Sequence, residues 1–140
     1  MDAKQLIELA MDARKRSYSP YSCYSVGAAV LCGDDTTFCG ANIENASYPA
    51  GVCAERVAVG NAVSSGRSDI KAIAIVGGNR EEEDNLSDYA WPCGICRQVL
   101  REFADPATFR VIVARSVEDY KEFTLEELLP NSFGPDNLDQ

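Results

Sequence analysis

Along the first part of the chain, the apolar residues change from a helical to a strand-like spacing. Residues 2–16 carry apolar side chains at helical intervals, which predicts an amphipathic helix, and Ser19-Pro20 ends that pattern. Residues 26–31 and 37–41 are short apolar runs on either side of Gly33-Asp34-Asp35, a pattern typical of a β-hairpin. The sequence therefore predicts a helix followed by two paired strands.

Two further helices and two buried strands alternate along the rest of the chain. Residues 53–65 and 93–103 return to helical spacing, and Gly66 is a stop signal for the first of these helices. Residues 70–76 and 109–114 are nearly unbroken apolar runs, as in strands that are covered on both faces. Alternating helices and strands predict an α/β fold in which helices sandwich a mixed sheet.

The remaining segments predict an edge strand and two exposed loops. Residues 123–125 favour a strand at the edge of the sheet, followed by a helical turn at 126–129. Residues 44–51 are rich in Asn, Ser, Pro and Gly, and residues 77–90 are polar and acidic, so we expect solvated loops in both places. No repeat or linker divides the chain, and we expect a single domain over residues 1–140.

The net charge argues against one class of partner. The chain carries 22 acidic and 13 basic residues, a net charge of −9, and its longest basic run is Arg14-Lys15-Arg16. Polynucleotide-binding proteins usually present a basic patch, so we expect no long nucleic acid as a partner, whereas a small uncharged nucleoside is compatible. No segment has the length of a membrane span, and the N-terminal residues lack the pattern of a signal peptide. We therefore expect a cytoplasmic protein with no membrane partner.

Cysteine and histidine content narrows the chemistry. The six cysteines are expected to be free thiols, because a reducing cytosol and an adequate core argue against disulfides. Histidine is absent, which removes the usual imidazole ligand, the commonest general base and every nucleophile–histidine pair. Acid–base chemistry must therefore fall to a carboxylate.

Three of the cysteines have the spacing of a catalytic zinc site. Cys53 opens one predicted helix, and Cys93 and Cys96 lie in the first turn of another, where the helix N-terminus favours the metal-binding thiolate. Three thiolates hold a zinc ion and leave its fourth position to water, which is the arrangement of a catalytic site. Glu55 is not needed as a ligand and can move the protons of that water. We predict one Zn²⁺ per chain, with Glu55 as the catalytic residue.

Two arginines are candidates for balancing the negative charge of three thiolates. Arg56 directly follows Glu55, and Arg97 directly follows Cys96. A fixed positive charge beside the sulfurs would restore the ability of the metal to acidify water. We favour Arg56 for this role; the alternative for either arginine is an ordinary surface ion pair.

The cysteines also allow interpretations without catalysis at a metal. The segment Cys93-Gly94-Ile95-Cys96 is compatible with a redox role, in which Glu55 would be dispensable. A structural zinc module would need a fourth protein ligand. Cys23, Cys32 and Cys39 have no metal-binding spacing, and we expect them to be small buried apolar residues.

Several ordered motifs add to the cysteine pattern. They are Tyr18-Ser19-Pro20-Tyr21-Ser22, Val26-Gly27-Ala28-Ala29, Gly40-Ala41-Asn42-Ile43-Glu44-Asn45-Ala46, Cys53-Ala54-Glu55-Arg56, Pro92-Cys93-Gly94-Ile95-Cys96-Arg97-Gln98 and Glu127-Leu128-Leu129-Pro130-Asn131-Ser132-Phe133-Gly134-Pro135. Over nearly the whole chain they resemble the cytidine deaminase family, in its small homotetrameric form with three cysteine ligands. The resemblance implies a three-layer α/β/α sandwich with a mixed sheet of roughly five strands.

The resemblance also implies an activity. It is the zinc-dependent hydrolytic deamination of cytidine and 2′-deoxycytidine to the corresponding uridines and ammonia, as in pyrimidine salvage. Cys53, Cys93 and Cys96 would bind the zinc. Glu55 would carry a proton from water to ring N3 while C4 is attacked, and would then help to protonate the departing ammonia.

The same resemblance assigns residues to substrate binding. Asn42 and Glu44 would hydrogen-bond the ribose 3′-hydroxyl, and their i, i+2 spacing in an extended segment points both side chains the same way. Ala54 and Tyr24 would be further substrate contacts, Tyr24 at a position where relatives carry a Phe that packs on the pyrimidine. Phe133 would either reach the site of a neighbouring subunit in a homotetramer or make a plain hydrophobic contact of the C-terminal tail.

The chain departs from the family pattern in one region. Loop 78–91 is longer and more acidic than expected, and Trp91 replaces a small residue, where it either lines the pocket or caps an interface. One alternative function is deamination of a modified cytosine nucleoside, as in the blasticidin-type deaminases, but the motif Asn42-Ile43-Glu44-Asn45-Ala46 argues against it. A non-catalytic zinc or redox module is the alternative of another class.

Overall fold

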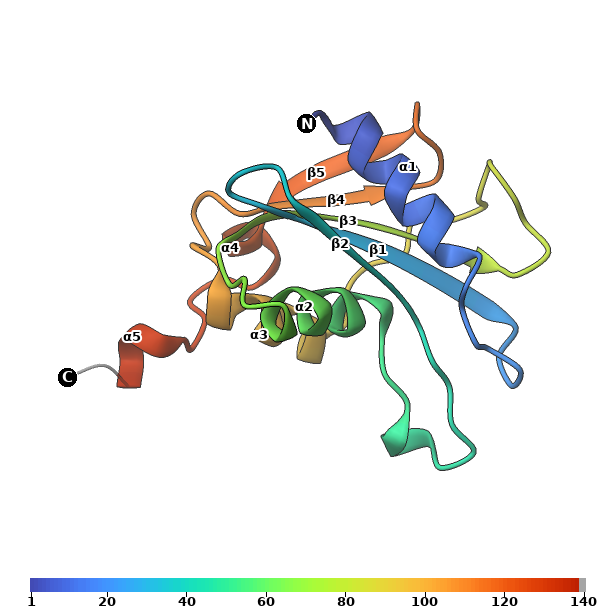
Figure 1. The fold of residues 1–140 in the computed structure, drawn as a ribbon, viewed down its shortest axis with the longest axis horizontal. Coiled ribbons are helices and arrows are strands. Elements are labelled where there is room, and N and C mark those ends of the chain that lie inside the picture. Colours follow the sequence, from blue (N-terminus) through green and yellow to red (C-terminus); the bar gives the residue numbers. More distant parts are fainter. Residues whose placement is uncertain (139–140) are drawn as a thin grey trace.

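A mixed sheet forms the centre of the molecule, which Figure 1 shows as a ribbon. The strands are β1 (Tyr24–Cys32), β2 (Thr37–Ala41), β3 (Ile70–Asn79), β4 (Arg110–Ala114) and β5 (Tyr120–Thr124). In this computed structural model, which describes residues 1–138, they form one five-stranded sheet in the order β2-β1-β3-β4-β5. The β3–β4 pair is parallel, and every other neighbouring pair is antiparallel.

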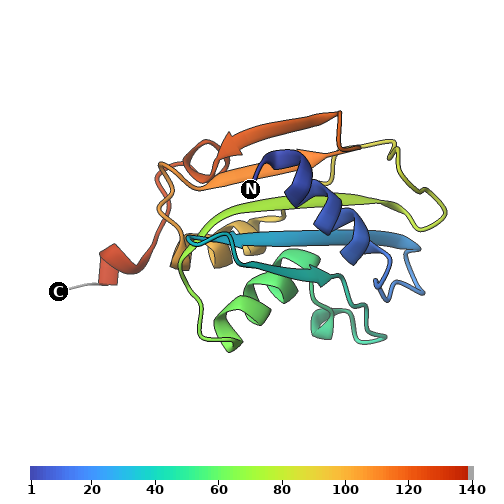
Figure 2. The ribbon, with the colours of Figure 1, turned by 45° about the horizontal axis from the view of Figure 1, so that its top comes forward.

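Helices cover both faces of this sheet. Helix α1 (Ala3–Arg14) lies on one face, and α2 (Ala54–Ser64) and α3 (Gly94–Phe103) lie on the other, as Figure 2 shows. The prediction of an α/β/α sandwich around a mixed sheet is therefore confirmed. Within residues 1–138, no helix combines the length and the apolar character needed to cross a bilayer. The short helical segments are η1 (Tyr48–Ala50), α4 (Leu125–Leu128) and α5 (Pro135–Leu138).

The sheet divides the hydrophobic core into two parts, because successive strand side chains point to opposite faces. In β1, Ala29 and Leu31 pack in the cluster that contains Leu6 of α1. Ala28 and Val30 pack in the cluster on the side of α2 and α3. Central strands with two covered faces must be apolar at nearly every position, which explains the unbroken apolar runs in the sequence.

Two glycines allow helices to approach the strands closely. A Cβ atom on Gly27 of β1 would lie 2.1 Å from the carbonyl oxygen of Ala10 in α1. A Cβ atom on Gly40 of β2 would lie 2.5 Å from the amide nitrogen of Ala58 in α2. Backbone atoms cannot move aside as a flexible side chain can, so only glycine fits at these two positions. The contact at Gly40 fixes the helix that carries Cys53 and Glu55 against the sheet.

Strand bounds differ from the predicted ones most at the end of β3 and at the start of β5. β3 continues to Asn79, so the expectation of a solvated loop from residue 77 is wrong for residues 77–79, which pair with the first residues of β1. Leu86, farther along that loop, is buried as well. At the other edge, β5 begins at Tyr120, before the predicted start, and ends at Thr124, where the Thr124 side chain caps α4.

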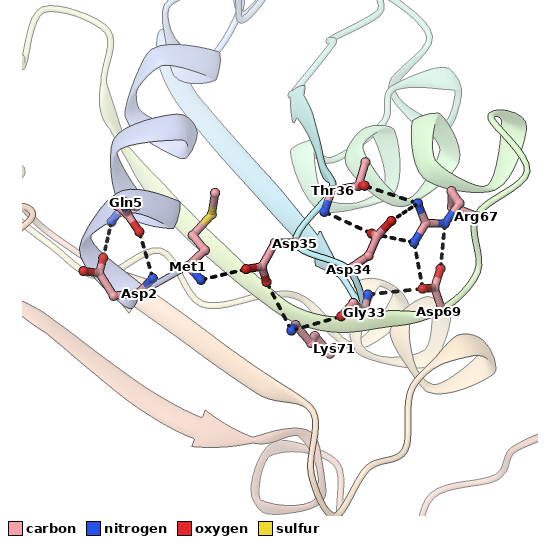
Figure 3. Close-up of polar contacts among 10 residues, drawn as sticks. All are labelled: Met1, Asp2, Gln5, Gly33, Asp34, Asp35, Thr36, Arg67, Asp69 and Lys71. Atoms are coloured by element: carbon pink, nitrogen blue, oxygen red, sulfur yellow. Dashed lines mark hydrogen bonds and ion pairs between the residues drawn. The ribbon is translucent and has the colours of Figure 1, made fainter.

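Ion pairs hold the β1–β2 turn in place (Figure 3). Arg67 contacts Asp34 of the turn and Asp69 just before β3, each at 2.8 Å, and Lys71 lies 3.2 Å from Asp35. Exposed ion pairs of this kind contribute little to stability, because water screens their attraction and both side chains lose conformational freedom. They therefore fix the path of the turn more than they stabilise the fold.

Arg14 connects the last turn of α1 to the ends of two strands. The side chain is buried, and desolvation lowers the pKa of its guanidinium. The guanidinium donates four hydrogen bonds to backbone carbonyls, at 2.6–3.0 Å: those of Ser25, Gly78, Asn79 and Glu82. Arg14 thus holds together the start of β1, the end of β3 and the loop that follows β3.

We expect Arg14→Ala to lower the free energy of unfolding by about 3 kcal/mol, because hydrogen bonds from a charged donor are strong and buried carbonyls would lose their partner. Arg14→Lys should recover only part of this loss, since an ammonium lacks the planar fork of the guanidinium. Urea denaturation measures both. Arg16→Ala, at an exposed position just after the same helix, is the control and should change stability by less than about 0.5 kcal/mol. A similarly small change in Arg14→Ala would contradict the prediction.

Candidate active site

The structure brings together three cysteine sulfurs from two helix starts. Cys53 is the N-cap residue of α2, Cys93 is the N-cap residue of α3, and Cys96 lies buried in the first turn of α3. Their Sγ atoms all lie within 4.8 Å of one another, and those of Cys93 and Cys96 are 3.5 Å apart. Both helices therefore direct their N-terminal ends at one point beside the sheet.

This sulfur cluster fits a zinc ion. Tetrahedral zinc with Zn–S bonds of about 2.3 Å places its sulfurs roughly 3.8 Å apart, close to the spacing observed here. The donor set is soft and contains no imidazole, which favours zinc over magnesium or calcium. In the part of the chain that the structure describes, no other group of three cysteine or carboxylate side chains is similarly placed. The cluster offers three ligands, so the fourth coordination position is available to water.

Arg56 supplies positive charge to this cluster. Its Nη2 donates a hydrogen bond to the Sγ of Cys53 at 3.5 Å. The pKa of the Cys53 thiol is lowered to about 5, mainly by a hydrogen bond from Cys96 and to a smaller extent by the Arg56 guanidinium. The same hydrogen bond to Cys53, together with burial, raises the pKa of Cys96. The Nε of Arg56 is buried and has no hydrogen-bond partner among the described residues. Arg97, the other candidate, instead donates to the carbonyls of Pro92 and Leu128.

Glu55 lies in the first turn of α2, two residues after Cys53. Its side chain is 5% exposed, and burial, with a smaller contribution from the Cys53 thiolate, raises the pKa of its carboxyl to about 7. A carboxyl group with a pKa near neutrality can both accept and return a proton during one reaction cycle. The structure thus places a carboxyl group that could carry protons directly beside the sulfur cluster.

A cavity of about 830 Å³ opens beside Glu55 and the cluster. This volume lies within the range of about 300–1,000 Å³ that is usual for small-molecule sites. Ala54, which is fully buried, lines the cavity next to Glu55, and Tyr24 lines it from the start of β1. Trp91 lines it as well, which favours the first of the two roles expected for this residue.

Asn42 and Glu44 both line this cavity. The side-chain oxygen of Asn42 accepts hydrogen bonds from Ser17 and from the Val26 amide, and its NH₂ group donates to the carbonyl of Tyr24. One N–H of Asn42 is left for a ligand.

The Glu44 carboxylate is held by its neighbours. It accepts hydrogen bonds from the amides of Tyr21 and Ser22 and from the Ser22 hydroxyl, which lowers the pKa of the carboxyl and keeps it ionised. Its remaining lone pairs can accept a further bond. A free donor on Asn42 and a free acceptor on Glu44 together suit a hydroxyl group, which both donates and accepts.

The structure separates Phe133 from the pocket of its own chain. The ring is 57% exposed, the backbone carbonyl accepts a hydrogen bond from Gln98, and the residue is not among those lining the cavity. Sequence reasoning, for its part, gave no role to Ser22, which orients Glu44, or to Tyr89, which lines the cavity. The position of Ser22 in the Tyr-Ser-Pro-Tyr-Ser motif was a signal that could have indicated its role. No residue pattern around Tyr89 indicated that it lines the cavity.

Comparison with known proteins agrees with this site. Residues 1–113 match the family model for the cytidine and deoxycytidylate deaminase zinc-binding region. The chain is 43% identical to a cytidine deaminase from Halalkalibacterium halodurans over 99% of this chain and 98% of that one. It is 41% identical to a cytidine deaminase from Sporosarcina psychrophila over 99% and 96%, respectively.

A solved structure agrees as well. The crystal structure of a cytidine deaminase from Burkholderia pseudomallei matches with a TM-score of 0.84 at 38% identity, covering 95% of this chain and all of that one. The cluster of Cys53, Cys93 and Cys96 and the zinc-binding family model together identify Zn²⁺ as the cofactor. Similarity of this extent, in sequence and in structure, shows that the chain belongs to the cytidine deaminase family.

Proposed function

We propose that this protein catalyses the hydrolytic deamination of cytidine and 2′-deoxycytidine to uridine and 2′-deoxyuridine, with release of ammonia, as a step of pyrimidine salvage. The observation that carries the proposal is the position of Glu55. Its buried carboxyl lies in the wall of a nucleoside-sized cavity, beside three sulfurs that fit zinc. The curated relatives from H. halodurans and S. psychrophila carry the name cytidine deaminase and support it.

The chemistry is divided between the metal site and Glu55. Cys53, Cys93 and Cys96 would hold the zinc, which when bound acts as a Lewis acid and lowers the pKa of water. Glu55 takes a proton from the attacking water and delivers it to N3 of the ring as the C4–O bond forms. It then passes the proton of the new C4 hydroxyl to the amino group as the C4–N bond breaks, the C4 carbonyl forms and ammonia leaves. Arg56 stabilises the ligand thiolates and limits their excess negative charge.

The other pocket residues orient the nucleoside. Asn42 donates a hydrogen bond from its free N–H to the 3′-hydroxyl, and Glu44 accepts a hydrogen bond from that hydroxyl. Tyr24 and Ala54 contact the substrate from β1 and from the start of α2. A pocket that fixes both the sugar and the ring brings C4 and N3 to Glu55 in one orientation, which is the geometric requirement for proton transfer.

For the assembly we infer a homotetramer, in which Phe133 reaches the pocket of a neighbouring copy. Its exposed ring and its distance from the cavity of its own chain support this role. Residues 1–140 act as one catalytic domain. The six cysteines include no disulfide in the structure and the proposed ligands must stay reduced, which suits a cytoplasmic location.

Absorbance-monitored turnover of cytidine, with zinc measured on the same sample, tests the proposed function. Loss of the cytidine absorbance band with release of ammonia and stoichiometric zinc is the expected result. Stoichiometric zinc without turnover of cytidine or deoxycytidine would overturn the proposal in favour of a modified cytosine nucleoside. If protein purified under reducing conditions and resupplied with zinc shows neither bound zinc nor turnover, the result would favour a structural or redox role for the cysteines.

Glu44→Gln should weaken recognition of the sugar. In wild type, 2′,3′-dideoxycytidine, which lacks the 3′-hydroxyl, should have a kcat/KM about 10–100-fold below that of deoxycytidine, because a hydrogen bond to a charged group is lost. In Glu44→Gln this ratio should shrink to a few-fold, since the amide binds the hydroxyl less strongly. Steady-state kinetics with both nucleosides measure the ratio. Glu102→Gln, an exposed carboxyl on α3, is the control, and an unchanged ratio in Glu44→Gln would exclude its proposed contact.

A further inference from the structure

The segment that leads into Cys93 is held by side chains and not by secondary structure. Residues 87–92 connect the acidic loop to α3, and the structure describes all of them. None of them takes part in a backbone–backbone hydrogen bond. Tyr89, Ala90 and Trp91 nevertheless line the cavity, so their positions set the width of the pocket on this side. Whatever fixes this segment therefore shapes the substrate site.

Side chains of the segment pack in opposite directions. Ala90 is buried, and a Cβ atom on Gly77 of β3 would lie only 2.8 Å from its Cβ, so Ala90 packs directly on the β3 backbone. The rings of Tyr89 and Trp91 are 6.4 Å apart, and Trp91 lies 5.5 Å from Phe123 of β5, centroid to centroid in each case. We call Tyr89, Trp91 and Phe123 the aromatic brace. It ties the cavity wall to the edge strand of the sheet.

Tyr89 is fixed at the outer end of the aromatic brace. Its hydroxyl donates a hydrogen bond of 2.5 Å to Asp119, in the turn between β4 and β5. The Arg115 guanidinium lies 5.1 Å, and the Lys121 ammonium 4.8 Å, from the centre of its ring. Arg115 also pairs with Asp119 and donates to the carbonyl of Ser87. Cations over the aromatic face and a hydrogen bond at the hydroxyl together limit the movement of the ring.

Trp91 keeps a surface that a ligand can use. It packs on Phe123 and yet is 45% exposed while lining the cavity. A planar indole surface beside a small-molecule pocket suits the flat ring or the apolar sugar face of a nucleoside. Glu55 and the three cysteines, in contrast, lie at the starts of α2 and α3 and are not part of the aromatic brace. The aromatic brace is thus placed to affect binding more than chemistry.

We propose that Trp91 is a nucleoside-contacting residue, and that Tyr89 is a positioning residue which holds it through the hydrogen bond to Asp119. This inference rests on the proposed function and adds a determinant of nucleoside affinity that lies outside the cysteine, Glu55 and Asn42–Glu44 elements. The edge hairpin β4–β5 then contributes to substrate binding although none of its residues lines the cavity.

The chain offers a built-in probe for the test. Trp91 is its single tryptophan, so the intrinsic tryptophan fluorescence comes from the pocket wall alone. Titration of the wild-type zinc protein with uridine, the product nucleoside, should change this fluorescence and saturate. Tyr89→Phe, which removes only the hydroxyl, should raise the KM for cytidine and the uridine Kd by about five- to tenfold, the effect of one lost hydrogen bond, with kcat within about twofold.

Three further variants distinguish a positioning role of Tyr89 from general damage to the protein. Asp119→Ala should reproduce the KM change, and the double variant should show no further increase, because both substitutions break the same contact. Glu122→Gln, which lies on β5 and is paired with Arg110, is the matched control and should leave KM and fluorescence unchanged. Zinc content should stay stoichiometric in the wild type and in all four variants.

The outcomes distinguish this inference from the proposed function. Wild-type protein that fails to turn over cytidine would overturn both. Normal wild-type turnover with an unchanged KM in Tyr89→Phe and Asp119→Ala would overturn the role of Tyr89 alone. Normal turnover with no fluorescence response to saturating uridine would overturn the role of Trp91.

Discussion

Glu55→Gln is expected to abolish deamination while the protein keeps its zinc and its fold. The amide has nearly the same shape as the carboxyl, but it cannot accept the proton of water or deliver it to N3. General acid–base catalysis by one side chain contributes about 10²–10⁴-fold to the rate. Because Glu55 both accepts and delivers protons, kcat should fall by a factor at the upper end of that range, about 10⁴. Steady-state kinetics on protein of measured zinc content give the result.

Glu55→Gln should lose activity without losing stability. Glu55 is 5% exposed, and a buried carboxyl that can ionise costs more to bury than a neutral amide. Thermal unfolding of Glu55→Gln should therefore occur at the same temperature as in wild type or at a higher one. Such a result is usual when a residue is kept for function at a cost in stability. Glu8→Gln, an exposed carboxyl on α1, should change neither property. Turnover within tenfold of wild type in a zinc-loaded Glu55→Gln protein would refute the assigned mechanism.

The local parts of this structure were readable from the sequence. Cys53 and Cys93 were predicted to open helices, and they are the N-cap residues of α2 and α3. Helix starts and buried strands leave signals within a few neighbouring residues, as apolar spacing and as turn residues. The meeting of the sulfurs at one point follows from two such starts at the same end of a sheet.

The long-range parts were not readable. The order of the strands depends on pairings such as Tyr24 with Asn79, which join residues far apart in the chain and leave no local pattern. That pairing also extends β3 into a segment whose polar neighbours predicted a loop. The contact of Trp91 with Phe123 is of the same kind, since it needs the edge strand in place before it exists. The family resemblance could show that Trp91 was unusual, but only the fold shows what it contacts.

Cys53→Ala is expected to remove both the metal and the activity, and it separates the zinc mechanism from a redox one. Cys53 is the only ligand on α2, so its loss leaves Cys93 and Cys96, and two thiolates hold zinc poorly. A redox site would need only those two cysteines and would survive the change. The two core clusters do not depend on the metal, so the variant should still fold. Metal analysis and cytidine turnover measure the two losses.

Chelation provides the matched comparison for this variant. Zinc joins the start of α2 to the start of α3, and binding to the folded state alone adds stability, so Cys53→Ala should unfold at a lower temperature than the wild type. A chelator should lower the unfolding temperature of the wild type to about that of Cys53→Ala and should leave the variant unchanged. Cys39→Ala, which removes a half-buried thiol away from the cluster, should keep zinc and activity. Stoichiometric zinc or cytidine turnover in Cys53→Ala would mean that the metal site is built on other residues, because the three-thiolate arrangement allows neither.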